Sequence, residues 1–315
     1  MKKLLAICLV LVSIFALCAC GGNNAMTMGT GGTAGTYYGY GGILGTQIKE
    51  AAGITVNVVS TDGSKANILG IDNGDYQLGT VQSDVMAYAA AGTRSFEVEG
   101  KMDSFRVIGG LYAEAVQLLT MDPEIKTVAD LKGKKVSIGA AGSGVYFNAM
   151  DILGAAGLTE EDIEPQYQSF ADSADALKDG KIDAAFIVAG APTPAVQELC
   201  TTTSATLIPI DGELADKLMQ DSPFYTTYTI PAETYNGQTE DVTTVTVKAT
   251  LIVSTSADET AVYNITKAIF DNIDAIKAAH AKGAELSLEN ATEGMTAPFH
   301  PGAAKYFAEK GITVK

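Results

Sequence analysis

The sequence predicts an α/β protein of two lobes, each a mostly parallel sheet flanked by helices. Short β-branched and apolar runs alternate with helical patterns from residue 25 to the end of the chain, which is typical of parallel sheets. A glycine-rich strand-to-helix segment occurs twice, so two lobes of one plan are expected. The length of 315 residues suits two domains of common size.

The order of elements follows from the hydrophobic pattern. Residues 25–29 and 55–61 predict strands, and residues 38–53 predict a helix between them. Further strands are expected at 105–109, 117–121, 135–139, 184–189 and 206–210. Ser256 and Glu259 form a capping-box pattern ahead of a long amphipathic helix. Its apolar face would hold Val262, Ile265, Ile269, Ile273 and Ile276.

The internal repeat pairs a segment of each half. "MTMGTGGTAGTYYGYGG" (26–42) and "KVSIGAAGSGVYFNAMDIL" (135–153) both run from a strand through a glycine-rich turn into a helix. "NGDYQLGTVQSD" (73–84) likewise matches "DGKIDAAFIVAG" (179–190). In open α/β sheets, ligands bind beyond the carboxyl ends of strands, where such turns lead into helices. Two such edges facing each other would form a cleft between the lobes.

The edges of this cleft carry polar groups. Thr33, Thr36 and Ser143 sit where a strand gives way to a helix, so their hydroxyls, nearby N–H groups and the helix dipole could receive a carboxylate. Gln82 and Asp84 follow the next strand and could accept hydrogen bonds from an ammonium or amide group. Each residue alone also fits ordinary turn and cap chemistry. Their recurrence in both halves favours a binding site.

Seven of the fourteen residues from 29 to 42 are glycine. We expect these glycines to let backbone N–H groups reach a bound carboxylate, while Tyr37 and Tyr38 cover the carbon skeleton of the ligand. The equivalent strand of the second lobe ends in "VAGAP" (188–192), which offers only backbone and apolar surface.

Catalytic and cofactor motifs are incomplete. Gly29 and Gly31 begin a dinucleotide fingerprint, but Ala34 occupies its third glycine position, and Ser143 lacks the flanking glycines of a hydrolase elbow. His280 and His300 lie far apart, so no metal site is expected, nor any cofactor. The formal net charge of −16 argues against binding nucleic acid or anionic lipid.

The chain begins like an exported lipoprotein. Lys2 and Lys3 precede an apolar run at 4–16 that is too short to span a bilayer, and the following residues resemble a bacterial lipobox ending at Cys20. Residues 1–19 would be a signal peptide and residues 20–27 a lipidated tether, with an ordinary secretory signal as the alternative. Cys200 would then be the one cysteine in the body of the protein, without a disulfide framework.

Together these segments resemble the TAXI family of solute receptors. The resemblance rests on "TGGTAGTYYGYGG", "VQSDV", "LYAEAVQLLT", "DLKGKKVSIGAAGSG", "LKDGKIDAAFIVAGAP", "VYNITKAIFDN" and "HPGAAKYFAEKG", in order from about Met28 to the C-terminus. That family supplies the extracytoplasmic binding subunits of one class of tripartite ATP-independent periplasmic (TRAP) transporters.

The resemblance implies a type II periplasmic-binding-protein fold, with the ligand in the cleft between the lobes. Lobe 1 would comprise residues 28–116 and 249–315 and lobe 2 residues 117–248, and the change of lobe in the repeat predicts hinge strands near Leu118 and Val247. It also implies a monomeric, non-enzymatic receptor that delivers glutamate, glutamine or a related dicarboxylate to a TRAP permease. The residues it assigns to the ligand are Thr36, Tyr37, Tyr38, Gln82, Asp84, Ser143, Gly144, Ala191 and Pro192.

Some residues depart from the family pattern. Val145 and Tyr146 stand where many relatives have threonine and a charged residue, which puts the ligand contacts of the second lobe in doubt. Neither Arg94 nor Arg106 lies in a cleft motif, so anion recognition would rest on N–H groups and hydroxyls. Glu114 could pair with a ligand ammonium or be a surface carboxylate.

Two other classes of function remain open on the sequence alone. A lipid-anchored sensory module could use the same cleft to report a ligand to a membrane kinase. An extracytoplasmic hydrolase would need Ser143 or Asp84 to meet a base in the folded protein.

Overall fold

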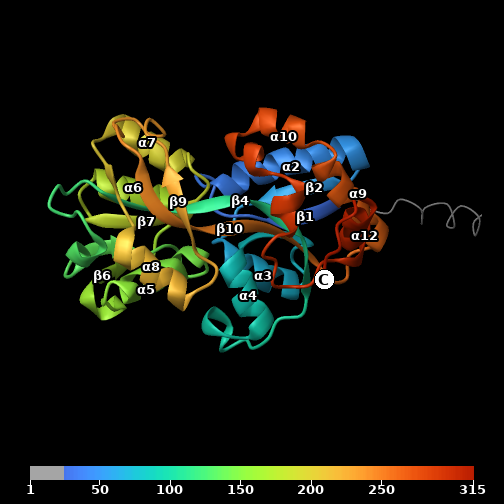
Figure 1. Ribbon diagram of the computed structural model, residues 1–315, viewed down its shortest axis with the longest axis horizontal. Helices are drawn as coiled ribbons and strands as arrows, with labels where there is room; N and C mark the ends of the chain where they lie inside the picture. The colour runs from blue at the N-terminus through green and yellow to red at the C-terminus, as the bar shows by residue number, and fades with distance from the viewer. Residues whose placement is uncertain (1–24) are drawn as a thin grey trace, which may run out of the picture.

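Two long strands run side by side through the whole molecule, β4 (Phe105–Thr120) and β10 (Val242–Ser254) (Figure 1). One end of this pair belongs to the first lobe and the other end to the second lobe. The structure is a computed structural model that describes residues 25–315. The predicted signal peptide and Cys20 lie outside these residues.

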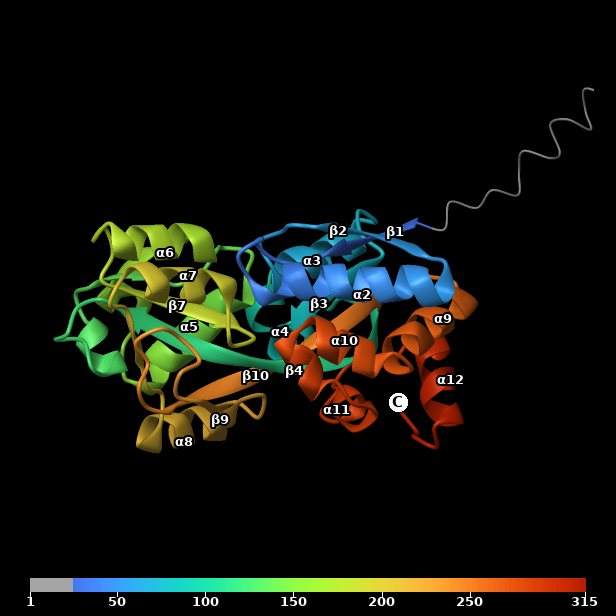
Figure 2. The ribbon, with the colours of Figure 1, turned by 90° about the horizontal axis from the view of Figure 1, so that it is seen from above.

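Lobe 1 is formed by the N-terminal and C-terminal parts of the chain, which lie side by side (Figure 2). Its N-terminal elements are β1 (Ala25–Gly29), α2 (Thr36–Ala52), β2 (Thr55–Val59), α3 (Ser64–Asp72), β3 (Leu78–Gln82), α4 (Ser83–Ala91) and the 3₁₀ helix η1 (Arg94–Phe96). Its C-terminal elements are α9 (Glu259–Phe270), α10 (Ile273–Ala279), η4 (Ala281–Glu285), α11 (Leu288–Thr292) and α12 (Pro301–Glu309).

Lobe 2 is the middle of the chain. Its first elements are η2 (Val128–Leu131), β5 (Lys135–Ser137), α5 (Gly144–Ala155), η3 (Glu160–Asp162), β6 (Glu164–Gln166) and α6 (Phe170–Lys178). Its remaining elements are β7 (Ala184–Ala189), α7 (Pro194–Thr202), β8 (Thr206–Ile208), α8 (Gly212–Asp221) and β9 (Thr226–Ile230).

The strands described join into one sheet of order β2-β1-β3-β10-β4-β7-β5-β6, with β8 paired to β4 and β9 to β10. In lobe 1, β1 pairs in parallel with β2 and β3; in lobe 2, β5 pairs in parallel with β6 and β7. Strands β4 and β10 run antiparallel to their neighbours. The predicted fold class, two lobes of mostly parallel sheet flanked by helices, is confirmed.

The segments 105–109 and 117–121, predicted as two strands, form the single strand β4. Gly109 and Gly110 lie within this strand, where close packing requires them. A Cβ on Gly110 would lie 2.8 Å from the carbonyl oxygen of Asn290, and one on Gly109 would lie 3.0 Å from the ring of Phe270. These glycines let α9 and α11 approach the strand closely.

The change of lobe occurs inside β4 and β10. Residues of β4 before Ala115 pair with β10, and from Ala115 onward the strand also pairs with β7. Val247 lies opposite Glu114 at this crossing, whereas Leu118 is paired with Phe186 inside lobe 2.

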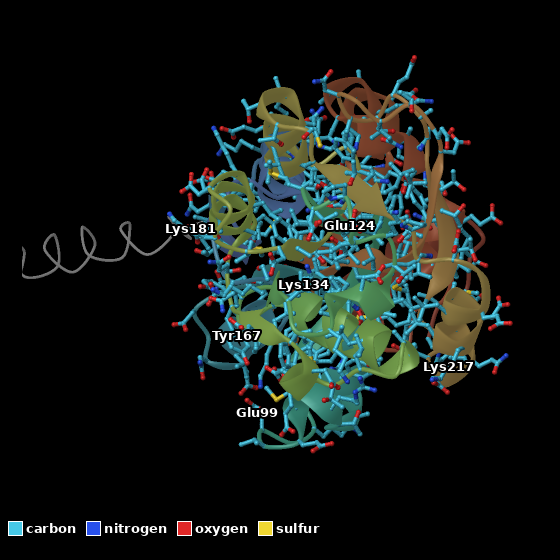
Figure 3. All side chains as sticks on the ribbon, turned by 90° about the vertical axis from the view of Figure 1, so that its left-hand side faces the viewer. Glu99, Glu124, Lys134, Tyr167, Lys181 and Lys217 are labelled. Carbon is cyan, nitrogen blue, oxygen red and sulfur yellow. The ribbon has the colours of Figure 1, made fainter. Side chains whose placement is uncertain are left out.

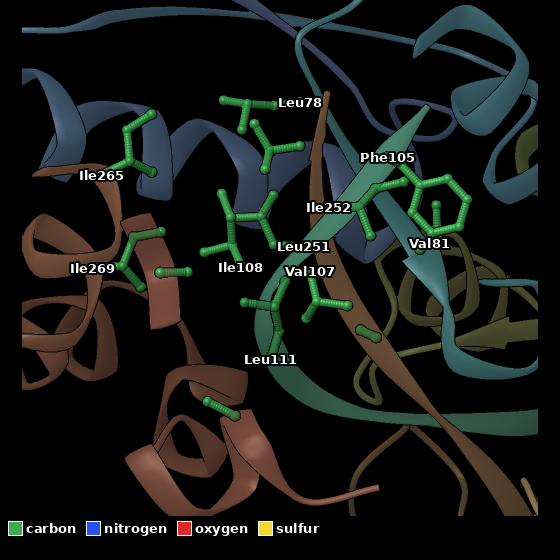
Figure 4. Close-up of a cluster of buried hydrophobic side chains, with 14 of the residues drawn as sticks. Leu78, Val81, Phe105, Val107, Ile108, Leu111, Leu251, Ile252, Ile265 and Ile269 are labelled. Carbon is green, nitrogen blue, oxygen red and sulfur yellow. The ribbon is translucent and has the colours of Figure 1, made fainter. Parts of the chain in front are cut away.

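Each lobe has a hydrophobic core of its own. In lobe 1, Leu78, Ile252 and Ile265 bring strands and C-terminal helices together (Figure 4). In lobe 2, Ile152 and Phe186 lie in a separate cluster. Because each lobe buries its own apolar surface, the lobes can move relative to each other without exposing either core.

The long C-terminal helix predicted from Ser256 onward is interrupted. Helix α9 is capped by Asp258, whose carboxylate accepts a hydrogen bond from the N–H of Ala261 at 2.9 Å, while Ser256 bonds Ser254 instead. It ends at Phe270, and α10 begins at Ile273. Aspartate is as good an N-cap as serine, and the observed N-cap, Asp258, lies two residues after the Ser256 that the capping-box pattern predicted.

The outer end of lobe 2 is covered by charged side chains of both signs (Figure 3). Lys134 pairs with Asp122 at 3.0 Å and Lys181 with Asp179 at 2.8 Å. Within residues 25–315, no helix is both long enough and apolar enough to span a bilayer.

Candidate functional site

A cavity of about 80 Å³ lies between the lobes. Lobe 1 and the crossing strand line it with Gly31, Gly32, Gly35, Thr36, Tyr37, Thr61, Asp62, Gly63, Ser64, Gln82 and Glu114. Lobe 2 lines it with Ala140, Ser143, Gly144, Val145, Gln168, Ser169, Phe170, Val188 and Ala189. A cavity of this size suits a compact molecule rather than a drug-sized one.

Four helices begin at this cavity. Helices α2 and α3 of lobe 1 start at Thr36 and Ser64, and helices α5 and α6 of lobe 2 start at Gly144 and Phe170. The first N–H groups of a helix have no partner within the helix, and its dipole places partial positive charge at this end. The four ends together create a cavity that favours an anionic group.

Two glycines of these turns are needed because the lobes meet there. A Cβ on Gly35 of lobe 1 would lie 3.3 Å from the ring of Phe170 of lobe 2, and a Cβ on Gly144 of lobe 2 would overlap Gln82 of lobe 1. The glycine-rich turns therefore allow lobe-to-lobe contact around the cavity as well as access to backbone N–H groups.

Hydrogen bonds join the lobes at the rim of the cavity. The hydroxyl of Thr36 donates to the carbonyl of Gly190 at 2.8 Å. The N–H of Ala66 donates to the carbonyl of Gly142 at 3.2 Å, and that of Ala195 to Ala34 at 3.1 Å. The Thr36 side chain thus holds the lobes together rather than pointing freely at a ligand.

Behind this rim, Asn148 of α5 forms the centre of a buried polar network, which we call the interlobe network. Its amide group donates to Asp84 at 2.9 Å and to the Tyr225 hydroxyl at 2.8 Å, and its oxygen accepts from Gln82 at 2.9 Å. Nearby, Arg94 of lobe 1 forms an ion pair with Asp151 of α5. Asp84 and Gln82 therefore contribute to lobe contact.

A buried acid forms one wall of the cavity. Glu114 lies in β4 at the crossing, and its Oε2 accepts a hydrogen bond from the hydroxyl of Tyr37. Burial raises the pKa of Glu114 to about 8, because an ionised carboxylate loses its hydration there. The Tyr37 hydrogen bond and Lys282 act in the opposite direction, lowering this pKa, whereas the charge of Asp84 raises it further.

Asp84 is also completely buried. Burial raises its pKa to about 7, against the lowering effect of its hydrogen bonds to the N–H of Val85 and to Asn148. It does not line the cavity, so its place is in the interlobe network.

The structure brings together half of the residues expected to bind the ligand. Thr36, Tyr37, Gln82, Ser143 and Gly144 line the cavity, as does Glu114. Thr33 is exposed and Tyr38 half-buried, and neither lines it. Ala191 and Pro192, joined by a cis peptide bond, also lie outside the lining, and Ala191 packs in a core cluster of lobe 2.

A second strand-to-helix turn of each lobe also lines the cavity and was not predicted from the sequence. Residues 61–64 of lobe 1 and 168–170 of lobe 2 contribute Asp62, Ser64 and Phe170 to the cavity. Both turns follow a strand and precede a helix, so the pattern that marked residues 29–42 and 139–144 would have found them.

Ser143 is arranged as a helix cap. Its hydroxyl donates to the carbonyl of Ala140 at 2.6 Å and accepts from the N–H of Tyr146 at 3.4 Å. His280 and His300 do not line the cavity: the His280 ring lies edge-on against Tyr40, and His300 caps α12. The geometry does not pair this serine with a histidine base. In the part of the chain described, no group of three or more His, Cys, Asp or Glu residues is placed to hold a metal ion.

The fold is that of the periplasmic solute-binding proteins. The alkanesulfonate-binding protein SsuA from Xanthomonas axonopodis pv. citri, bound to MOPS, superposes with a TM-score of 0.51 at 16% identity over 91% of each chain. A putative L-cystine ABC transporter protein from Listeria monocytogenes gives a TM-score of 0.52 at 18% identity, covering 84% of this chain and 98% of that one. A protein of Bordetella bronchiseptica RB50 gives 0.57 at 18%, covering 90% and 89%.

A family model described as the NMT1-like family matches residues 28–311. The chain belongs to the NMT1-like family.

Proposed function

We propose that this protein is an extracytoplasmic solute receptor of the TAXI type. It captures a small organic acid or an amino acid by closure of its lobes and is held at the membrane by a lipid on Cys20. The observation that carries this proposal is the cavity between the lobes, where four helix N-termini meet a buried carboxyl group. Helix N-termini bind carboxylates without help from basic side chains.

The arrangement of the lobes supports a closure mechanism. The lobes contact each other through Thr36, Ala66 and the interlobe network, and they are joined by strands β4 and β10. A ligand bound between the lobes would touch both, so it would stabilise the contacting arrangement over a separated one.

A thermal-shift screen tests the receptor function. The purified protein is unfolded and refolded to remove bound ligand, then heated with single amino acids and dicarboxylates. A ligand present at about 100 times its Kd adds roughly 2.7 kcal/mol of stability, which raises Tm by about 2 to 5 °C at this size. Ser143→Ala removes a cap next to the cavity and should reduce the shift. No shift with any small acid or amino acid would contradict the proposal.

The proposed partner is a TRAP permease driven by an ion gradient. In proteoliposomes containing the permease encoded beside the receptor, uptake should require the receptor and an imposed ion gradient. Uptake that requires ATP instead of an ion gradient would assign the receptor to an ABC system and contradict the proposed TRAP partner.

The proposed anchor is tested at Cys20 itself. Cells fed a labelled fatty acid should label the wild-type protein, and Cys20→Ser should abolish the label and release the protein from the membrane fraction. A variant that keeps its label would show that the lipid is elsewhere.

A further inference from the structure

The charged groups that line the cavity are all acidic. Asp62 and Glu114 are the ionisable carboxyl groups among the lining residues, and no lysine, arginine or histidine of residues 25–315 is among them. The cation that acts on Glu114 is Lys282, which forms an ion pair with Glu285 and lies 3.4 Å from the Tyr228 hydroxyl. The lysines shown at the end of lobe 2 in Figure 3 lie outside the cavity lining.

Glu114 has one oxygen left for a ligand. Its side chain is 2% exposed, Oε2 accepts from Tyr37, and Oε1 has no hydrogen-bond partner among residues 25–315 and is not one of the fully buried unpaired atoms, so it opens into the cavity. A carboxyl oxygen that opens into a cavity and has no protein partner is free to accept a hydrogen bond from a donor group of the ligand. Tyr37 fixes the orientation of this carboxyl group from α2, one of the four helices that begin at the cavity.

We propose that Glu114 receives the positively charged group of the ligand, so that the cavity selects an acid carrying an ammonium group over a dicarboxylate without one. The carboxylate of such a ligand would lie at the helix N-termini, and its ammonium group would donate to Oε1 of Glu114. This inference rests on the receptor function proposed above and chooses between the two ligand classes that it left open.

A dicarboxylate fits this cavity poorly for a simple electrostatic reason. Its second carboxylate would lie near Asp62 and against Glu114, which could then never ionise, and no basic side chain lines the cavity to neutralise the added charge. An ammonium group in the same place neutralises Glu114 and satisfies its free oxygen. The charges of a zwitterion therefore match the two ends of the site.

The first test compares matched ligands on the wild-type protein. Each amino acid is paired with the acid that lacks only its amine, such as glutamate with glutarate and alanine with propionate. In isothermal titration calorimetry, the amino acid that the protein binds should have a Kd at least about 100-fold lower than that of the matching acid without the amine. A site that hydrogen-bonds a polar group of its ligand rejects an analogue that lacks this group. Equal affinity for glutamate and glutarate would overturn the inference.

The second test changes the acid. Glu114→Gln keeps the shape and removes the ionisable group, and it should weaken binding of the amino acid by about 100-fold. At neutral pH the free variant should be at least as stable as the wild type, because it has no carboxyl group to keep protonated. Glu160→Gln is the matched control, since Glu160 also accepts hydrogen bonds from two tyrosines, Tyr146 and Tyr167, but lies outside the cavity lining. It should leave affinity unchanged within about twofold.

The outcomes separate this inference from the proposed function. A dicarboxylate that binds best, or full amino-acid affinity in Glu114→Gln, overturns the assignment of Glu114 and leaves the receptor standing. No binding of any member of either series overturns both. If Glu114→Gln does not fold, the matched-ligand comparison on the wild-type protein decides alone.

Discussion

Two carboxyl groups near the crossing of the lobes, Glu114 and Asp84, are completely buried, which disfavours their ionised forms. Burial raises the pKa of Glu114 to about 8 and that of Asp84 to about 7. In the unfolded chain both acids ionise near pH 4, so at neutral pH the folded protein holds protons that the unfolded chain has released. The folded ligand-free protein therefore loses stability as pH rises from about 4 to 8 through these two groups.

This gives a prediction for stability. Between pH 5 and pH 7 each group should lower the free energy of unfolding by up to about 1.4 kcal/mol per pH unit. Asp84→Asn has no charge to bury and should flatten the part of this slope that belongs to Asp84. Urea unfolding at pH 5, 6, 7 and 8 measures it. A wild-type stability that rises steadily over this range would show that these acids are not held protonated.

Ligand binding should depend on pH in the opposite direction. An ammonium group binds the ionised form of Glu114, so binding below pH 8 releases a proton, and affinity should rise by up to about tenfold per pH unit as pH increases towards 8. The groups that act on Glu114 from the surrounding elements are Tyr37, Asp84 and Lys282.

Titrations in two buffers of different ionisation enthalpy at pH 7 should report the release of close to one proton, and Glu114→Gln should abolish it. Affinity that is flat from pH 6 to pH 8 in the wild-type protein would contradict the assignment of that proton to Glu114.

At the scale of single elements, α5 shows how a helix start can be shaped by the opposite lobe. Its first residue is Gly144, where a Cβ would overlap the side chain of Gln82, whereas a Cβ on Gly154 near its other end would meet nothing within 4 Å. Contact with lobe 1 therefore requires glycine at position 144, whereas no neighbouring atom requires it at position 154.

We predict that Gly144→Ala keeps lobe 2 folded but prevents the lobes from meeting, with a loss of ligand affinity of about 100-fold. Gly154→Ala is the control: it should leave affinity unchanged and raise stability by about 0.5 to 1 kcal/mol, since alanine is favoured over glycine inside helices. Calorimetry and urea unfolding measure both variants. Wild-type affinity in Gly144→Ala would show that Gln82 moves aside without cost.

The elements also show what the sequence could predict. Hydrophobic alternation predicted β1, α2 and β7, because these elements are bounded by glycine-rich turns. It could not predict β4 as one strand, since the role of Gly109 and Gly110 depends on α9 and α11, which pack on them from far along the chain.

The candidate site was predictable to a similar degree. Strand-to-helix turns pointed to Thr33, Thr36 and Ser143, and of these Thr36 and Ser143 line the cavity, because the location of such turns follows from the order of elements. The free oxygen of Glu114 could not be predicted: a carboxylate in an apolar strand becomes a site only when the opposite lobe and Tyr37 enclose it.

For the whole molecule, the important feature is the balance between lobe contact and lobe separation. Asn148 is fully buried and bonds Gln82, Asp84 and Tyr225 at once; the bonds to Gln82 and Asp84 cross between the lobes, whereas Tyr225 lies in lobe 2 itself. When the lobes separate, water can replace these partners.

We therefore predict that Asn148→Ala shifts the ligand-free protein towards separated lobes and weakens ligand binding about 10- to 100-fold, because Gln82 and Asp84 of lobe 1 would be buried without this partner when the lobes are in contact. Small-angle X-ray scattering should show a larger radius of gyration than for the wild type. Asn236→Ala, which loses a hydrogen bond to Cys200 within lobe 2, should scatter like the wild type. Identical scattering from both variants would show that Asn148 does not control the lobes.

The two strands that join the lobes have a further consequence. Between residues 25 and 315 the chain passes from lobe to lobe in β4 and β10, and these strands are hydrogen-bonded to each other at the crossing, with Val247 opposite Glu114. They form one ribbon, so the lobes share a single axis of bending instead of several independent connections. The separation of one pair of labels, one on each lobe, would then report the state of the entire molecule, and the acid that meets the ligand lies on the axis itself.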